Sequence, residues 1–533
     1  MRECIRHTEL PHTTRLFADL VYQFDRVRSF YAHAPFDPGS FGAAAAGVRL
    51  EPSHRRALVE ALALQNQDGG PAAQEHLDRL ARPETLVVAS GQQVGLYTGP
   101  IFTIYKALSA ARLAAQLTAR GIPAVPVFWL ATEDHDLQEV HHAWVFDAQN
   151  RPVRLQALTS PDSRLPVGGV PVGDAARDLL RQALADLPHG PAVARLAERA
   201  YGNGATFAAG FRSLLRGLLE RQGLLLLDPM APPIRQLAAP LIRRAILAAP
   251  ELATELLARG QALHAAGYHV QVHLEDKTSL VFLLEQGRRT ALRRSGDTYF
   301  ANGASHSSAA LVARLESMPE DFSPNALLRP VVQDFLLPTV AYIGGPAELA
   351  YLAQAEVLYR RLLGRMPVAL PRAAFTILDS HAAKLLDRYR LTVLDVLRGE
   401  AHLERSIAGS LIPAELETTF RQGQQQIQEA LDSVHRQLAH FDPTLAAALG
   451  TSRRKIEHQF DKVRAKAGRE SLRRQDRARS DAASLLGLIL PHKALQERFY
   501  SVLPFLARHG LDLIDRLEAA IAFDCPDHQV LVG

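Results

Sequence analysis

The chain has 533 residues, of which 22% are charged and 47% hydrophobic, and a formal net charge of +4 at pH 7. A chain of this length is expected to hold two or more domains and at least one large core, and its ordinary charge content argues against long disordered regions. The small net charge does not indicate a nucleic-acid partner, and we find neither a leader peptide nor the roughly twenty-residue apolar run of a membrane span, so we expect a cytoplasmic protein.

Residues 1–84 have the composition and apolar spacing of helices. Cys4 lies at the beginning of this segment, and Cys525, the only other cysteine, lies near the opposite end of the chain. Two cysteines exclude a disulfide framework and a cysteine-built zinc site. Because both lie in terminal segments away from the motifs described below, we do not expect a cysteine nucleophile.

The stretch 86–139 predicts one βαβ unit, which implies parallel strands. Residues 86–89 are a short apolar run, 90–100 a loop with three glycines, 101–120 a helix, and 125–131 a second buried strand. Ligands of such sheets gather at the carboxyl ends of the strands. We therefore expect the loop and the polar residues after the second strand to lie at a binding site.

Each of these polar clusters has two interpretations. Lys106 and Thr103 lie three apart on one helix face, where Lys106 could hold an anion or could be a lysine whose stem merely packs on apolar neighbours. The second strand is followed by a cluster that could bind an ammonium group, a sugar hydroxyl or a metal, or could only cap a helix: Glu133, Asp134, His135 and Asp136. Two such clusters in one unit favour a site.

Residues 150–320 are interpreted as one or more insertions in the core. Segment 153–172 suggests a hairpin or extended insertion, 175–222 a helix, and 223–227 a third core strand. It ends at Asp228, which could contact a ligand or only form a turn. His269 and His273 would share a strand face, but zinc needs further ligands. Residues 279–301 alternate like a small meander.

Residues 327–376 predict the second half of the core. A strand at 339–343 is followed by the tight Gly344-Gly345-Pro346 loop and a helix at 347–363, and the last strand candidates are 368–370 and Phe375–Leu378. Glu348 lies in the first turn of the helix, where it could bind a ligand or only complement the helix dipole.

From residue 380 the composition changes to that of a helical hairpin. Apolar residues from Leu416 to Leu438 are spaced three, four or seven apart, as in a coiled-coil seam, and a second helix is expected from about Arg453. Residues 453–479 are basic, but they favour a solvated coiled-coil face over nucleic-acid binding, since aromatic residues are not interleaved. Residues 491–506 predict a largely apolar closing helix.

Several common nucleotide motifs are absent. No G-x4-G-K-[ST] or G-x-G-x-x-G sequence lies at a strand–helix junction, so neither a Walker-type ATPase nor an NAD enzyme is favoured. The His-x-x-His signature of synthetases is also absent, and Thr103 and Lys106 occupy the comparable spacing.

The motifs carry a resemblance to a known family. SGQQVGLYTGP-x2-T-x2-K at 90–106, followed by PVFWLATEDHD at 126–136, resembles the signature of the cysteine-adding enzymes of the bacillithiol pathway, the BshC family, and the segments 325–334, 342–348, 495–498 and 503–506 resemble its later motifs. This resemblance implies a Rossmann-like α/β core, like that of class I aminoacyl-tRNA synthetases, with inserted connecting segments and a C-terminal helical coiled-coil domain. We predict domains at 1–380, with insertions at 150–320, and at 381–533.

The resemblance also implies an activity: addition of L-cysteine to glucosaminyl-malate in the last step of bacillithiol synthesis, by a cytoplasmic homodimer. Amide formation requires an activated carboxylate, so ATP or another nucleotide is the expected cofactor, with Mg²⁺ as its counterion. For this activity we expect Lys106, Asp134, His135 and Asp136 to be catalytic. Lys106 and the loop amides, with Gln92, Thr98 and Thr103, would hold phosphate or malate carboxylates, and the 133–136 cluster would orient the cysteine ammonium or the sugar amine, with His135 or an acid as the base.

Substrate binding is assigned to a larger set, in which Glu348 would hold the α-ammonium of cysteine: Gln92, Thr98, Thr103, Glu133, Tyr342, Gly344, Gly345 and Glu348. The candidates for nucleotide binding are Lys493, Gln496, Arg498 and Tyr500. No metal site built from protein ligands is predicted.

Two other functions are consistent with the same residues. The chain could be a nucleotidyltransferase or synthetase-like enzyme for another amino acid or RNA, although no anticodon-binding module is evident. It could also be a non-catalytic scaffold that recruits partners through its coiled coil, but the dense polar residues after both strands weigh against a decayed site.

Overall fold

The computed structural model describes residues 3–157, 165–202 and 204–533 and divides into two compact units. The first unit comprises residues up to 148, then 152–376 and 497–531, and the second comprises 149–151, 377–496 and 532–533. The change of unit after residue 376 lies close to the predicted domain boundary at 380. Segment 497–531, which follows the coiled coil in sequence, belongs to the first unit.

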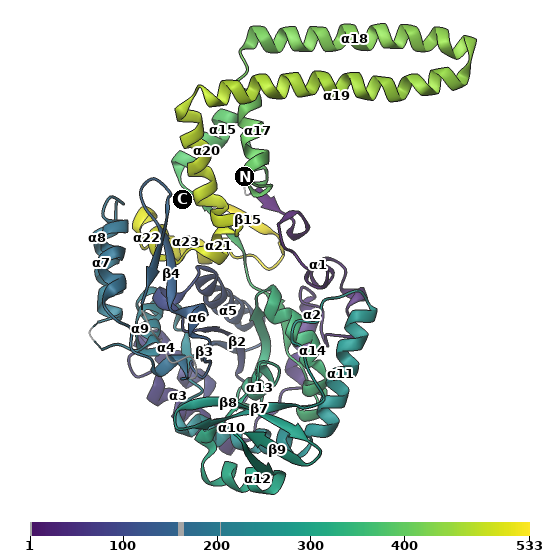
Figure 1. Ribbon diagram of the computed structural model, residues 1–533. Helices are drawn as coiled ribbons and strands as arrows, with labels where there is room; N and C mark the ends of the chain where they lie inside the picture. The colour runs from purple at the N-terminus through teal and green to yellow at the C-terminus, as the bar shows by residue number, and fades with distance from the viewer. Residues whose placement is uncertain (1–2, 158–164, 203) are drawn as a thin grey trace. The chain divides into compact units, whose positions relative to one another are not determined.

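The first unit is built on a five-stranded parallel sheet with the order β13-β12-β2-β3-β6, of which β2 and β3 are labelled in Figure 1. Helix α5, Phe102–Ala119, connects β2 to β3 and completes the predicted βαβ unit. The third predicted strand is confirmed as β6. The five strands are β2 (Leu86–Gln93), β3 (Ala124–Ala131), β6 (Leu225–Leu227), β12 (Thr339–Gly344) and β13 (Val368–Pro371).

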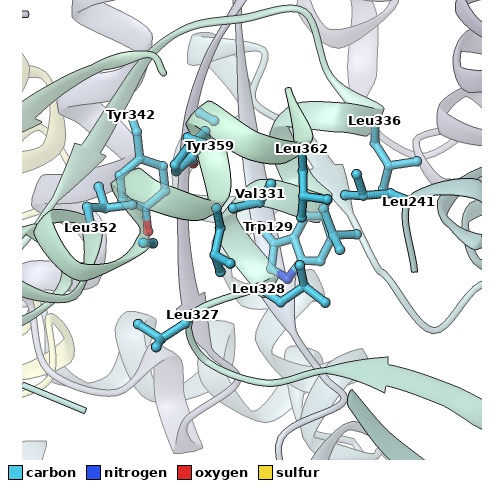
Figure 2. Packing of buried hydrophobic residues seen from close by; sticks show 14 of the residues in the cluster. Trp129, Leu241, Leu327, Leu328, Val331, Leu336, Tyr342, Leu352, Tyr359 and Leu362 are labelled. Carbon is cyan, nitrogen blue, oxygen red and sulfur yellow. The ribbon is translucent and has the colours of Figure 1, made fainter. Parts of the chain in front are cut away.

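Alternate residues of β2 enter two different cores. Val87 and Ala89 pack with Trp129 on one face of the sheet, whereas Leu86 and Val88 pack against helix α5 and its neighbours on the other face. Figure 2 shows Trp129 in the first of these cores, which it shares with Leu328, Leu362, Tyr342 and Tyr359. Burial on both faces explains the continuous apolar strands.

Strand β2 is longer than predicted. It continues past Ala89 to Gln93, and its last residues pair in register with β3, with Gln93 opposite Ala131. The predicted loop at 90–100 therefore begins as strand. Gly91 is required there, since a Cβ at this position would lie 2.8 Å from the Trp129 carbonyl oxygen.

The amino-terminal part is mainly helical, as predicted, after the short strand β1. A separate three-stranded sheet has the order β1-β15-β14. These elements are β1 (Glu3–Ile5), α1 (Arg15–Tyr22), α2 (Pro38–Ala46), α3 (Pro52–Gln65), α4 (Gly70–Leu80), β14 (Phe375–Leu378) and β15 (His528–Val532).

The first part of the inserted region begins with an antiparallel hairpin of β4 and β5. The predicted insertion 153–172 overlaps β5, but its residues 158–164 lie outside the described part of the chain. The helix predicted over 175–222 is divided into three, because Gly190 starts one helix and the Thr206 side chain caps another. The elements are β4 (His142–Phe146), β5 (Pro152–Gln156), α7 (Ala175–Leu184), α8 (Gly190–Ala200) and α9 (Phe207–Leu219).

The predicted meander at 279–301 is confirmed as part of a five-stranded sheet, β10-β9-β8-β7-β11, whose pairs are all antiparallel. The strand predicted for His269 and His273 is wrong, because these residues lie in irregular backbone between α11 and β7. The elements are α10 (Pro232–Leu247), α11 (Ala249–Ala265), β7 (Thr278–Glu285), β8 (Arg288–Ser295), β9 (Thr298–Ala301), β10 (Ala304–Ser307), α12 (Ser308–Ser317) and β11 (Phe322–Pro324).

The chain returns to the parallel sheet through α13, Arg329–Leu336. Strand β12 then leads through the Gly344-Gly345 turn into α14, Pro346–Leu362, as the sequence predicts. This repeats the geometry of β2 and α5, so the amino end of a second helix lies at the carboxyl edge of the sheet.

The second unit is helical, and its predicted coiled coil is confirmed as the long antiparallel hairpin of α18 and α19 (Figure 1). Helix α19 begins at Pro443 rather than near Arg453, because Asp442 caps it and Gly450 is accommodated within the helix. The helices are α15 (Ser380–Tyr389), α16 (Val393–Leu397), α17 (Glu400–Ser410), α18 (Ala414–Phe441), α19 (Pro443–Arg473) and α20 (Asp476–Ile489).

The single closing helix predicted at 491–506 is wrong. His492 and Lys493 have positive φ angles of 48° and 65°, which interrupt a helix. The chain instead forms the short helices α21 (Gln496–Phe499), α22 (Leu503–His509) and α23 (Leu513–Ala520). Among the described helices, none has the length and apolar character needed to cross a membrane.

Candidate active site

A cavity of about 430 Å³ lies at the carboxyl ends of β2, β3 and β12. Its wall includes the end of β2, the first residues after β3, and the turn into α14. This is the edge at which parallel sheets bind ligands. The two polar clusters predicted from the sequence therefore face one cavity, together with residues from the inserted antiparallel sheet and from α21.

Lys106 forms the base of this cavity. Its side chain is 1% exposed, and its ammonium group donates hydrogen bonds to the Gly91 carbonyl oxygen (2.9 Å) and to Gln92 Oε1 (2.7 Å). It also forms an ion pair with Glu348 from α14. Burial lowers the pKa of Lys106, and the attraction of Glu348 only partly opposes this effect.

Glu348 joins the two halves of the sheet through its contacts. Besides Lys106, its carboxylate accepts hydrogen bonds from the Tyr342 hydroxyl (2.7 Å) and from the Gly345 N–H (2.9 Å). Burial alone would raise the pKa of Glu348, but Lys106 and these two donors outweigh it and lower the pKa. Glu348 is therefore held as a carboxylate, opposite a cation.

The residues after β3 form an acidic wall. Glu133 is buried and pairs with the equally buried Arg235 at 2.8 Å. Asp134 is half-buried and accepts a hydrogen bond from the Gln93 amide at 2.8 Å, and the same amide donates to Glu139 at the exposed rim. The carboxylates of Asp134 and Glu139 are the acidic groups of this wall that can reach a ligand.

His135 and Asp136 lie outside the cavity wall. His135 Nδ1 is 3.2 Å from an Arg289 nitrogen, and burial, reinforced by Arg289 and opposed by Asp134, lowers the pKa of His135. The imidazole is therefore neutral near pH 7. Asp136 is exposed and caps the short helix α6, Leu137–Val140, through the Glu139 N–H (3.3 Å).

Arginines form a second group of lining residues, the basic wall of the cavity. Arg372 follows β13 and makes a two-point ion pair with Glu497, with nitrogen–oxygen distances of 2.9 and 2.7 Å. Arg329 begins α13, and Arg498 lies on α21; both line the cavity with Arg372. Arg289, from β8, approaches Asp134 at 3.6 Å.

The remaining predicted residues take different places. Gln92 and Gly345 line the cavity, whereas Thr98, Thr103 and Tyr342 are fully buried beside it. Gly344 ends β12.

Of the nucleotide candidates, only Arg498 lines the cavity. Lys493 is exposed and belongs to the second unit, as does Gln496, whose amide bonds to the backbone of Ile377 and Leu488. Tyr500 is buried among aromatic rings.

Sequence reasoning did not single out Gln93, Glu139, Arg289, Arg329, Arg372 or Glu497. A signal existed for Arg372, because it directly follows β13 and so lies at the ligand-binding edge. Arg329 lies inside segment 325–334, which resembles a motif of the family, but the sequence pattern alone indicates no role for it. Nothing in the local sequence places Arg289 at the cavity, because it comes from an insertion.

The fold and the cavity define a Rossmann-like α/β protein with a polar, charge-lined site at the carboxyl edge of its parallel sheet. Residues 3–373 match the model of the bacillithiol biosynthesis BshC N-terminal Rossmann-like domain, and residues 375–532 match that of the BshC C-terminal coiled-coil domain. The chain belongs to the BshC family.

Similar proteins cover nearly the whole chain. A protein of Solibacter usitatus is 50% identical over 529 residues, 99% of each chain, and one of Koribacter versatilis is 37% identical over 531 residues, again 99% of each. A third, from Salinibacter ruber, is 32% identical over 97% of this chain and 96% of its own. All three carry the name "Putative cysteine ligase BshC".

Proposed function

We propose that this chain is a ligase that joins L-cysteine to the amine of glucosaminyl-malate in the final step of bacillithiol biosynthesis. The family match across the chain supports this function. The observation that carries it is the cavity itself, which is lined both by the carboxylates of Asp134 and Glu139 and by the arginines of the basic wall. Such a lining suits two small substrates that carry amino and carboxyl groups.

In this proposal the acidic wall receives the attacking amine. Asp134 has one carboxylate oxygen bonded to Gln93 and lies at the cavity surface, so it is placed to hold the amine and take its proton. The backbone N–H of His135 donates a hydrogen bond to the other carboxylate oxygen of Asp134 (2.8 Å), and Arg289 approaches that oxygen at 3.6 Å. Glu348, matched by Lys106, orients the ammonium group of cysteine.

A carboxylate and an amine do not condense in water without activation. We therefore propose that ATP or another nucleotide, accompanied by Mg²⁺, activates the cysteine carboxylate. When bound, the nucleotide would supply a phosphoryl or adenylyl group to the carboxylate, and phosphate or AMP would then leave as the amide forms. We further propose that the chain works as a homodimer in the cytoplasm.

The decisive experiment is mass spectrometry of a reaction that holds glucosaminyl-malate, cysteine, ATP and Mg²⁺. We expect a product with the mass of the amide, and the appearance of AMP or ADP identifies the activated intermediate. Omitting the nucleotide should abolish the product. No product under any nucleotide would contradict the proposed function.

The Asp134→Asn variant tests the assigned role of the acidic wall. Because Asp134 is half-buried and on a turn, we expect the variant to fold normally while its turnover falls by about 10²–10⁴-fold. The Asp136→Asn variant, which changes only the exposed cap of α6, is the matched control. Equal activity of both variants and the native protein would remove Asp134 from the mechanism.

A further inference from the structure

The basic wall holds more positive charge than its protein partners neutralise. Lys106 is paired with Glu348 and Arg372 with Glu497, and Arg289 approaches Asp134. These pairs account for three of the five cations that line the cavity in the described part of the chain. The other two are Arg329 and Arg498.

Within the described part of the chain neither arginine forms a direct ion pair, although the more distant carboxylate of Glu348 attracts both and that of Glu497 attracts Arg498. Arg329 donates to the Tyr351 hydroxyl (2.7 Å) and to the Gln333 side-chain oxygen (3.4 Å), which are both neutral. The guanidinium of Arg498 has no hydrogen bond or ion pair with any residue that the structure describes. Guanidinium groups left in this state are suited to bind carboxylates, often in pairs of parallel hydrogen bonds.

A third donor points to a ligand at the same wall. Arg372 is 7% exposed, and its Nε is buried with no hydrogen-bond partner among the described residues, although its other nitrogens bond to Glu497 and to a carbonyl oxygen. An unsatisfied buried donor is costly, so it is expected to meet an acceptor in the working protein.

We propose that Arg329 and Arg498 form the subsite for the two carboxylates of the malate moiety, and that Arg372 Nε donates a hydrogen bond to the ligand at the same place. This inference rests on the proposed function. It fixes the orientation of the acceptor, with malate on the basic wall and the amine of the sugar toward Asp134 and Glu139. The subsite distinguishes the acceptor from sugars that carry an amine but no dicarboxylate.

The test uses the variants Arg329→Gln and Arg498→Gln, with Arg195→Gln on the exposed face of α8 as the control. We expect each cavity variant to raise the KM for glucosaminyl-malate at least tenfold while the KM values for cysteine and ATP change less than twofold. The control should match the native protein. An increase in the KM for ATP or cysteine, with that for glucosaminyl-malate unchanged, would overturn the assignment.

A binding arm separates this inference from the proposed function. Titration of the native protein with malate alone, followed by calorimetry, should show saturable binding that both cavity variants lose and the control retains. If the native protein makes no amide but this pattern holds, the dicarboxylate subsite stands and the ligase function fails. If malate binds all four proteins equally, or none of them, the subsite is wrong.

A second, independent observation concerns the two cysteines. Cys4 in β1 and Cys525 lie 521 positions apart in sequence, yet their Sγ atoms are 3.5 Å apart, and no disulfide joins them. The segments that carry them are held together nearby by His7 Nε2 with the Pro526 carbonyl oxygen (2.9 Å) and by the Tyr22 hydroxyl with Asp527 (2.6 Å). Cys4 is exposed and Cys525 half-buried, so a small reagent can reach the pair.

We infer that this pair is a reversible dithiol that exchanges with low-molecular-weight disulfides such as cystine. One thiolate attacks the disulfide and releases one small thiol; the other then attacks the mixed disulfide and releases the second. The protein loses two electrons and two protons, and one small disulfide becomes two thiols. The new bond closes almost the whole chain into a loop and so stabilises the folded first unit.

Intact-mass measurement after incubation with cystine tests this inference. We expect the native protein to lose two hydrogen atoms and to gain no adduct, whereas Cys4→Ser and Cys525→Ser should each gain one cysteine. The oxidised native protein should also melt at a higher temperature than the reduced form. Two separate cysteine adducts on the native protein, without a cross-link, would overturn the inference.

Discussion

Lys106 and Glu348 are the residues on which the geometry of the cavity depends most directly. Lys106 comes from the helix after β2 and bonds to the Gly91 carbonyl oxygen of that strand. Glu348 comes from the helix after β12 and accepts from the Gly345 N–H of its own turn, and the ion pair between the two side chains joins these segments. Their pairing fixes the two amino-terminal helix ends against each other. Breaking a buried pair by removing one partner leaves the other charge without compensation.

Replacing Lys106 by methionine should therefore affect stability and activity separately. We expect Lys106→Met to lower the free energy of unfolding by about 3–5 kcal/mol, because Glu348 is left without its cation. Adding Glu348→Gln should restore most of the stability but not the turnover. Urea unfolding and the product assay measure the two effects; recovery of activity in the double variant would show that the pair is only structural.

The sequence predicted part of this site, for reasons visible at single residues. Asp134 comes shortly after one predicted parallel strand, and Lys106 and Glu348 lie in the helices that begin after two others. The local sequence pattern therefore places all three at the carboxyl edge of the sheet. Arg289 and Glu497 could not be placed in this way. Arg289 arrives through an inserted antiparallel sheet, and Glu497 through a segment that returns to the first unit after the coiled coil; local sequence does not encode either path.

At the scale of elements, the β2–β3 pairing sets the position of the cavity. Gly91 lies where the two strands approach most closely, and a Cβ there would meet the Trp129 carbonyl oxygen at 2.8 Å and its Cβ at 2.9 Å. Both atoms belong to the buried strand β3. Strand β2 also carries the Gly91 carbonyl oxygen, which accepts a hydrogen bond from Lys106.

We expect Gly91→Ala to lower the free energy of unfolding by about 1–3 kcal/mol through overpacking, and to reduce turnover because the acceptor of Lys106 shifts. The control is Gly42→Ala in helix α2, where a Cβ would meet nothing within 4 Å. That variant should be neutral or slightly more stable, since alanine favours helix over glycine. Thermal unfolding of both variants decides; equal stability would show that β3 yields to the extra carbon.

Two predicted elements differ from the observed ones in their extent. The sequence indicated a strand only at 86–89 because Ser90-Gly91-Gln92-Gln93 is not apolar, yet parallel pairing with β3 carries the strand onward. The predicted closing helix at 491–506 is interrupted by His492 and Lys493, which both have positive φ angles. Histidine and lysine do not indicate this backbone conformation in a sequence. Tertiary pairing and turn geometry, which local patterns do not report, decided both cases.

Strand β15 makes the stability of the first unit depend on pH. His528 is buried, contacts the Thr376 hydroxyl at 2.8 Å, and has its pKa lowered to about 4, mainly by burial and despite the nearby Glu497. His7 and Arg372 also face it and lower the pKa further. In the unfolded chain a histidine has its ordinary pKa near 6.5.

The unfolded state therefore binds a proton between pH 6.5 and 4 that the folded state does not bind. The stabilising difference is fully present above pH 6.5 and is lost as the pH falls toward 4, by about 3 kcal/mol. We expect His528→Gln to remove this component, so that the stability difference between native protein and variant shrinks as the solution is acidified. Urea unfolding at several pH values measures it; a constant difference would contradict the assignment to His528.

At the scale of the whole molecule, the hairpin of α18 and α19 leaves apolar side chains exposed that its own packing does not cover. No residue of α18 is buried, and Val434 and Val463 are 47% and 56% exposed on the two helices. The two helices do contact each other, for example through the edge-on rings of Phe420 and Phe460. A two-helix hairpin of this length usually buries its remaining apolar side chains against further helices.

A homodimer formed through this hairpin would supply those helices, and it is the arrangement we propose. We expect the double variant Val434→Glu and Val463→Glu to sediment as a monomer under conditions where the native protein sediments as a dimer, because charge on both helices opposes burial. The matched control is Leu64→Glu, since Leu64 is 65% exposed on α3 in the first unit. If the hairpin variant stays dimeric while Leu64→Glu dissociates, the first unit forms the interface; if the native protein is itself monomeric, the proposed dimer is wrong.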